Sequence, residues 1–163
     1  MSKQKITPCL WFDNNAEEAV NFYTSVFKHS KIHKVMRYGE AGPGAEGSVM
    51  TISFQIEGQD FLALNGGPQF KFNEAISLIV NCEDQKEVDE LWTKLTQDGG
   101  QESQCGWLKD KFGMSWQITP KALIEMVQDK DPEKAQRVFR AMLGMKKIQI
   151  DELEEAYEGA KAR

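Results

Sequence analysis

The chain has 163 residues, of which 40% are hydrophobic and 28% charged, and its formal net charge at pH 7 is −5. This length suits a domain with its own core, and an acidic balance without a basic cluster argues against nucleic acid as a partner. There is no apolar run near the ~18 residues of a membrane span and no signal segment, so we expect no membrane partner and a cytoplasmic location.

The first half of the chain predicts one strand, one helix and three further strands. Residues 6–13 are strand-like, and Ala19, Phe22, Tyr23 and Val26 then follow the i, i+3, i+4, i+7 spacing of a helix face. Strand patterns bounded by Gly and Pro follow at 31–39, 47–58 and 59–67.

The second half repeats this order. A strand-like segment at 75–82 precedes a helix face whose first member, Val88, lies 69 positions after Ala19. The candidate helix caps Asn15 and Asp84 obey the same shift. Shorter strand patterns follow at 99–104, 105–111 and 114–120.

The repeat predicts an α+β fold in which two tandem βαβββ modules form a cupped mixed or antiparallel sheet with helices outside. Residues 1–120 make up this paired domain. Residues 121–163 change to helical patterns, with a helix start at Asp131-Pro132 and an end at Gly144, and form a C-terminal helical extension of the same domain. We expect the extension to cover a sheet edge or a partner subunit.

Alternation along the strands sorts side chains into an apolar face and a polar face. In 50–56, Ile52 and Phe54 share the apolar face and Thr51, Ser53 and Gln55 the polar one. The same rule groups Leu62 and Leu64 with the apolar face and Trp116 with the core, and leaves Trp107 undecided between pocket and interface. The polar face is either the wet side of a sheet or the lining of a concave pocket. In the second interpretation the ligand-binding residues are Phe12, Thr51, Ser53, Gln55, Asn65, Ser77, Trp107 and Gln117.

The chain also resembles a known family. "FY" at Phe22-Tyr23, "LNGGP" at 64–68 and "CGWLKDKFGMSWQITP" at 105–120 resemble the PhnB-like branch of the vicinal-oxygen-chelate (glyoxalase/bleomycin-resistance/dioxygenase) superfamily. Members of this branch are often described as 3-demethylubiquinone-9 3-methyltransferase-like. The resemblance implies paired modules curled into a cup, a homodimer, and a divalent metal held by His and Glu on the first and last strands of the modules.

Carried over by strand and spacing, the metal-ligand positions of the superfamily fall on Pro8, Ala63, Ser77 and Gln117. Proline and alanine have no side-chain donor, and serine and glutamine are weak without carboxylate company. We therefore expect no metal and no other cofactor.

Other candidate chemistry is sparse. His29 and His33 lie at the exit of the first helix and are interpreted as a solvated junction. A general acid or base would have to be a loop carboxylate such as Asp60, Asp110 or Glu46, and Asp110 is expected in an exposed turn. "GPGAEG" at 42–47 matches G-x-G-x-x-G, but a strand follows it where a nucleotide-binding loop would open a helix, so we interpret it as a loop over the mouth of the cup.

These observations favour a metal-free small-molecule-binding protein, with a small-molecule ligand that is polar or aromatic without strong charge. One alternative is an enzyme, either a methyltransferase or a metal-assisted lyase or dioxygenase, acting on an aromatic or quinone-like substrate. Another is a dimerisation unit whose terminal helices bind a partner. No catalytic residue is assigned.

Overall fold

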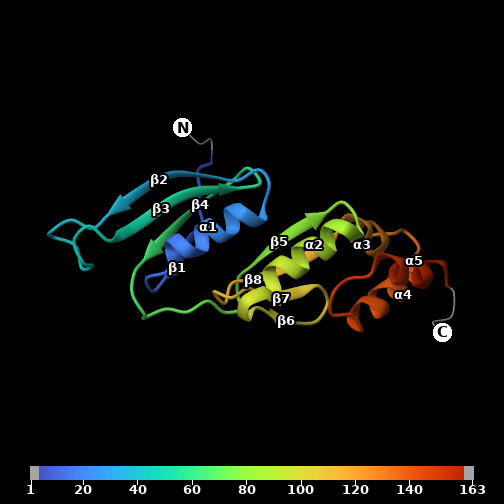
Figure 1. The fold of residues 1–163 in the computed structure, drawn as a ribbon. Coiled ribbons are helices and arrows are strands. Elements are labelled where there is room, and N and C mark those ends of the chain that lie inside the picture. The colour runs from blue at the N-terminus through green and yellow to red at the C-terminus, as the bar shows by residue number, and fades with distance from the viewer. Residues whose placement is uncertain (1–3, 160–163) are drawn as a thin grey trace. The chain divides into compact units, whose positions relative to one another are not determined.

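A computed structural model describes residues 4–159 of the chain, which divides into two compact units after Phe72. Each unit contains one predicted βαβββ module with its own four-stranded mixed sheet, and the second unit also carries the C-terminal helices (Figure 1). The predicted α+β class and the two modules are confirmed.

The first unit has a helix on one face of its sheet. It contains β1 (Cys9–Phe12), α1 (Ala16–Val26), β2 (Lys31–Arg37), β3 (Val49–Ile56) and β4 (Gln59–Asn65). The strand order is β1-β4-β3-β2, with β1 parallel to β4 and the other pairs antiparallel. Ala19, Val20 and Tyr23 are fully buried where α1 packs on β3 and β4, as the apolar periodicity of the helix predicts.

The second unit has the same topology with shorter edge strands. It contains β5 (Ser77–Cys82), α2 (Gln85–Thr96), a 3-10 turn (Gln97–Gly99), β6 (Gln101–Glu102), β7 (Trp107–Lys109) and β8 (Ser115–Pro120). The strand order is β5-β8-β7-β6, with β5 parallel to β8. The predicted α2 face, Val88, Leu91, Trp92 and Leu95, is buried, and Asp84 caps the helix by accepting a hydrogen bond from Glu87 N at 2.8 Å.

The repeat shift differs by one residue between helices and strands. The helices begin at Ala16 and Gln85, 69 positions apart, whereas the buried strand ends Phe12 and Cys82 are 70 apart. The link between strand and helix is therefore one residue shorter in the second module. Because a shift of one residue moves a strand side chain to the other face, the counterpart of Ser77 is Thr7 and not Pro8 as predicted.

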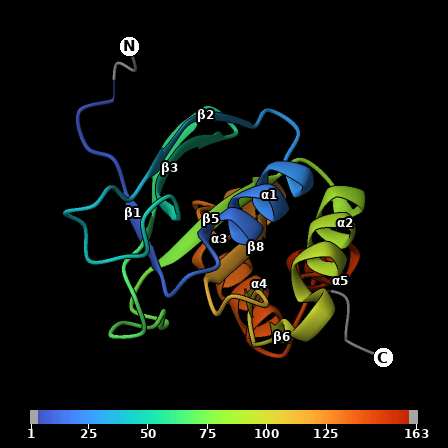
Figure 2. The same cartoon turned by 60° about the vertical axis from the view of Figure 1, so that its left-hand side comes forward.

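The predicted C-terminal extension forms three helices (Figure 1 and Figure 2). These helices share a small core. They are α3 (Lys121–Val127), α4 (Pro132–Leu143) and α5 (Ile150–Glu158). Asp131 caps α4 by accepting from Glu133 N at 2.9 Å, and Pro132 occupies the first turn, as predicted. The core of the extension consists of Leu123, Val138, Met145, Ile148 and Leu153. In residues 4–159, no helix is long and apolar enough to cross a membrane.

The extension is joined to the rest of the second unit by backbone hydrogen bonds. Cys105 N donates to Met145 O at 2.8 Å, and Gly106 N donates to Lys146 O at 2.7 Å. Gly106 has φ +81°, and a Cβ there would lie 2.9 Å from Ile118 O and 3.1 Å from Ile148 Cγ1. Only glycine allows this close approach without displacing its neighbours.

Candidate ligand-binding faces of the two sheets

Each sheet has a helix face, which packs against α1 or α2, and an open face on its other side. In β3, Ile52 and Phe54 are buried on the helix face, and Thr51, Ser53 and Gln55 are half-buried on the open face. This split is the predicted one. It follows from the two-residue alternation of a strand that packs on a helix from one side only.

The prediction is wrong for β4, because the turn before it reverses the parity. Glu57 and Gly58, with φ of 45° and 82°, form a two-residue hairpin turn that pairs Ile56 with Gln59. Even-numbered residues of β3 therefore share a face with odd-numbered residues of β4. Residues opposite each other across the strands are Ile52 with Ala63, Ser53 with Leu62, and Thr51 with Leu64.

Asn65 and Phe12 consequently lie on the helix face, and the prediction that they line a pocket is corrected. Asn65 Oδ1 accepts from Ala16 N at 2.9 Å, and its Nδ2 donates to Val49 O at 3.0 Å. It thus caps α1, while the predicted cap Asn15 makes no side-chain capping bond. Phe12 is 3% exposed and meets Phe72 edge-on, with ring centroids 5.2 Å apart.

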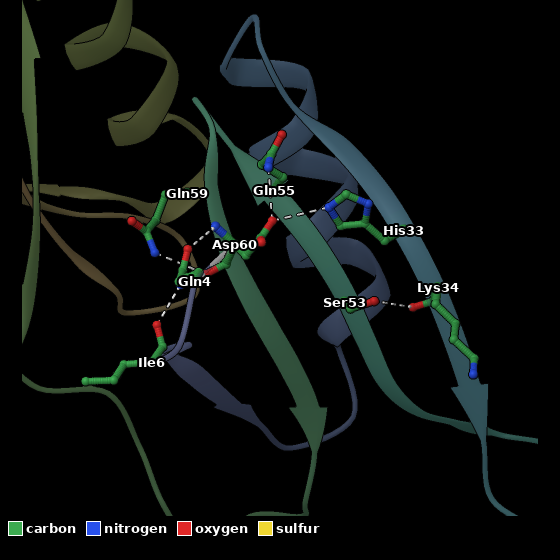
Figure 3. A network of polar contacts seen from close by, with 8 residues as sticks. All are labelled: Gln4, Ile6, His33, Lys34, Ser53, Gln55, Gln59 and Asp60. Atoms are coloured by element: carbon green, nitrogen blue, oxygen red, sulfur yellow. Dashed lines mark hydrogen bonds and ion pairs between the residues drawn. The ribbon is translucent and has the colours of Figure 1, made fainter. Parts of the chain in front are cut away.

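The open face of the first unit carries a polar cluster at the start of β4 (Figure 3). Asp60 Oδ1 accepts from Gln55 Nε2 at 3.0 Å and lies 3.3 Å from His33 Nε2. The backbone of Asp60 is held by Gln4, whose Nε2 donates to Asp60 O at 3.0 Å and whose Oε1 accepts from Asp60 N at 3.1 Å. His33 is exposed, as its interpretation as a solvated residue predicts, but a β-bulge between Ile32 and Lys34 turns its ring toward Asp60, and no sequence pattern indicated this contact.

The open face of the second unit brings three predicted residues together. Trp107 is paired with Gln117 across β7 and β8, and Gln117 Nε2 donates to Ser77 Oγ at 2.8 Å. The neighbouring row across the strands is Lys109, Ser115 and Ser77. Trp116 lies on the helix face and is 2% exposed, as predicted.

Asp110 is buried in the β7–β8 connection and not in an exposed turn as predicted. It is 2% exposed. Its Oδ1 accepts from Phe112 N at 2.8 Å and Met114 N at 3.1 Å, and its Oδ2 accepts from Trp116 Nε1 at 2.8 Å. The flanking lysines suggested a solvated turn, but this carboxylate organises the turn from inside. No local pattern reveals the contact with Trp116.

The residues at the superfamily's metal-ligand positions do not fit a divalent cation. With the corrected shift of 70 residues, Thr7 is the counterpart of Ser77 and Cys9 is the counterpart of Ile79. Cys9 lies opposite Leu62 across the strands, and Ile79 lies opposite Gln117. Leu62 therefore replaces Ala63 as the counterpart of Gln117. Two hydroxyls, a leucine and a neutral amide contain no imidazole, thiolate or carboxylate ligand. Between Gln4 and Gly159, no three His, Cys, Asp or Glu side chains gather in a ligand-like group.

The G-x-G-x-x-G match at 42–47 lies in the connection between β2 and β3. Tyr38 N donates to Ser48 O and Gly47 N to Tyr38 O, both at 2.9 Å, so the two strands continue their pairing across the loop. Tyr38 Oη also donates to Asn65 O at 2.6 Å. No helix begins at the loop, so it lacks the helix N-terminus that receives a nucleotide phosphate.

Comparison with known proteins identifies relatives of the paired modules. The 3-demethylubiquinone-9 3-methyltransferase family matches residues 4–119. A Bacillus cereus PhnB protein, provisionally described as a 3-demethylubiquinone-9 3-methyltransferase, is 43% identical over 72% of this chain and 99% of its own, with a TM-score of 0.66. No curated protein matches significantly.

More distant structures share the fold alone. A Pseudomonas aeruginosa protein is 19% identical over 72% of this chain and 98% of its own, with a TM-score of 0.60. The genomically encoded fosfomycin resistance protein FosX of Listeria monocytogenes is 13% identical over 74% of this chain and 94% of its own, with a TM-score of 0.50. The chain belongs to the PhnB-like 3-demethylubiquinone-9 3-methyltransferase family, which has the vicinal-oxygen-chelate fold.

Proposed function

We propose that this protein binds a small polar or aromatic molecule on the open faces of its sheets, without a metal ion held by side chains at the superfamily positions. The observation that carries the proposal is the neutral pair Gln117–Ser77, with its 2.8 Å hydrogen bond, beside Trp107. Amide and hydroxyl groups offer donors and acceptors but no negative charge for a cation.

Trp107 supports the aromatic part of this ligand description. It is half-buried on the open face, so part of its ring is accessible. A stacked aromatic pair contributes about 0.5–1.5 kcal/mol beyond the area that it buries. Trp107 would supply the stacking surface and Gln117 the adjacent hydrogen bonds. Small-molecule sites commonly combine aromatic side chains with a few polar groups that orient the ligand.

A thermal-shift screen of uncharged and singly charged metabolites, with elemental analysis of the purified protein, tests this proposal. We expect ligands that raise the melting temperature of the native protein and lose this effect in Gln117→Ala and Trp107→Ala. Thr93→Ala, an exposed change on α2, is the matched control and should keep it. A stoichiometric metal whose removal abolishes binding would contradict the proposal, as would ligands indifferent to both open-face variants.

The His33–Asp60 contact favours a second candidate, an enzyme that removes a proton from its substrate. The side chains are 38% and 15% exposed, so the ring is accessible while the carboxylate that orients it is more enclosed. Transfer of a methyl group to a substrate hydroxyl, the reaction named by the description of the Bacillus cereus relative, releases a proton that such a histidine accepts.

An assay with a demethylated quinol and S-adenosylmethionine decides between the two candidates. If the enzyme proposal holds, His33→Gln lowers turnover at least about a hundredfold, the usual contribution of a general base. Lys34→Gln, a neighbouring change on β2, should leave it unaltered. No turnover by the native protein would refute this candidate. Metal-assisted lyase and dioxygenase reactions are not proposed, because the donor set does not fit the metal.

We also propose that the protein is a cytoplasmic homodimer. The edge strand β2 supports a dimer, since Ile32, Val35 and Met36 are 43%, 41% and 45% exposed there. Sedimentation equilibrium of the native chain should give twice the mass of one chain, and Val35→Lys should reduce it to one. A native protein that sediments as a single chain would overturn the proposal.

A further inference from the structure

A small hollow of about 150 Å³ opens on the second unit beside β7 and β8. Its lining includes Glu74, Gln101, Ser103, Trp107, Lys109 and Ser115. Trp107, Lys109 and Ser115 belong to the open face, so the hollow extends the binding surface described above. It combines an aromatic ring, a cation and a hydroxyl.

The hydroxyl of Ser115 is the least expected group in the lining. Ser115 is 1% exposed, and its Oγ has no hydrogen-bond partner among the described residues. A buried hydroxyl without a partner is costly, and native proteins rarely leave one. Because Ser115 is one of the residues that line the hollow, a molecule bound there can supply the missing partner.

Lys109 lies directly across the strands from Ser115, on the same face. The ammonium group of Lys109 is paired with the carboxylate of Glu74. The side chains are 35% and 60% exposed, so solvent screens the pair and another carboxylate can exchange for Glu74. Glu102 also borders the hollow, but its Oε1 accepts from Trp92 Nε1 at 2.7 Å and its Oε2 lies 3.8 Å from Lys146 Nζ.

The next row of the sheet offers a flat and partly apolar surface. It consists of Trp107, Gln117 and Ile79, side by side across β7, β8 and β5. Ile79 is 58% exposed although its side chain is aliphatic. Rows on one face are two residues apart, about 6.5–7 Å, which is close to the length of a benzoate ion.

We propose that the hollow binds a planar monocarboxylate, such as an aromatic acid. Its carboxylate replaces that of Glu74 at the Lys109 ammonium and accepts a hydrogen bond from Ser115 Oγ. Its ring leaves the hollow past Trp107, the one member of the neighbouring row that lines it, and lies over Gln117 and Ile79. Glu74 is thus a built-in competitor for the ligand. This inference rests on the proposed binding function and refines it, because it adds one negative charge to a ligand expected without strong charge.

Calorimetric titration of the full chain with benzoate, and with benzamide as its uncharged counterpart, tests the inference. We expect benzoate to bind more tightly than benzamide. Glu74→Gln removes the competitor and should tighten benzoate binding about threefold or more, and Lys109→Met should weaken it at least about tenfold, since a charge-assisted contact is lost. Neither change should alter benzamide binding more than about twofold, since benzamide carries no charge for Lys109.

Ser115→Ala separates a binding role from a structural one. Because the hydroxyl has no internal partner, we expect the melting temperature to stay equal or rise, while benzoate binding weakens about fivefold to tenfold, as for one lost hydrogen bond. Circular dichroism checks that each variant is folded. Glu74 is exposed, so its variant remains informative if Ser115→Ala does not fold.

Two outcomes would overturn the inference. One is benzoate binding no tighter than benzamide in both the native protein and Glu74→Gln. The other is benzoate binding that Lys109→Met leaves unchanged. In either case, a metabolite from the thermal-shift screen that depends on Gln117 and Trp107 would leave the proposed function standing, whereas a screen without such a ligand would remove both.

Discussion

Replacing Asp110 with alanine should destabilise the second unit more than any surface change. The side chain is 2% exposed and accepts hydrogen bonds from Phe112 N, Met114 N and Trp116 Nε1. Alanine leaves these three donors without their acceptor in the turn between β7 and β8. The same turn sets Lys109 opposite Ser115, so the change should also disorder the proposed binding surface.

The magnitude follows from the number of donors. An orphaned buried donor costs about 1–3 kcal/mol. The two backbone donors regain water if the turn opens, and alanine removes the cost of burying a carboxylate, so we take the low end for each donor. The expected loss is about 3 kcal/mol, against a total stability of about 5–15 kcal/mol for a typical domain. Asp110→Asn keeps one acceptor oxygen but sets its amide N–H groups against a donor, and should cost about 1–2 kcal/mol.

Urea unfolding followed by far-UV circular dichroism measures this loss. Tryptophan fluorescence is less suitable, because the change alters the surroundings of Trp116. With a slope of about 1–3 kcal/mol per molar urea, the midpoint should fall by roughly 1–3 M. Glu125→Ala, an exposed carboxylate on α3, is the control and should change stability by less than about 0.5 kcal/mol. An Asp110→Ala midpoint equal to that of the control would refute the reasoning.

Three further predictions concern other positions. Gly106→Ala should lower the free energy of unfolding by more than 2 kcal/mol, and Gly58→Ala by about 1 kcal/mol. Both residues have positive φ, but only Gly106 is also crowded by its neighbours. Equal losses in urea unfolding would contradict this prediction. Asn65→Ala should cost about 1–2 kcal/mol by the same measurement, since it removes the cap of α1, and a loss below 0.5 kcal/mol would argue against the capping role. Burial, aided by nearby carboxylates, raises the pKa of Cys82 to about 12, so its thiolate is scarce until the pH nears that value. Treatment with iodoacetamide at pH 8, followed by mass spectrometry, should therefore show that exposed Cys9 is labelled first. Faster labelling of Cys82 would contradict its burial.

Local patterns were sufficient for the helices and for strands that pack on one side. The faces of α1 and α2 and the alternation of β3 and β8 all matched, because burial against a single neighbour imposes a period that the sequence displays. The cap Asp84 was equally local. The same alternation placed Ser77 and Gln117 on one face of their sheet.

The errors share a different cause, since each depended on a register or a contact that residue type does not encode. A two-residue hairpin turn reversed β4 and moved Asn65 to the helix face. A one-residue difference between the two strand–helix links misplaced the counterpart of Ser77. Asp110 was predicted to be exposed because lysines flank it, but it is buried and accepts a hydrogen bond from Trp116, six positions further along the chain. The β-bulge that turns His33 toward Asp60 was also not predicted, because no glycine or proline marks it in the sequence.

The backbone hydrogen bonds from Cys105 and Gly106 to Met145 and Lys146 cannot form during synthesis until the C-terminal segment has been translated. The acceptors are translated about 40 residues after the donors, which takes roughly 2–8 s at typical ribosomal speeds. During that interval the first unit has all of its strands, while the second exposes two N–H groups and the apolar surface destined for Ile148. A nascent chain at this stage is the species that a chaperone or an aggregate would capture, and a premature stop before residue 145 would make that state permanent.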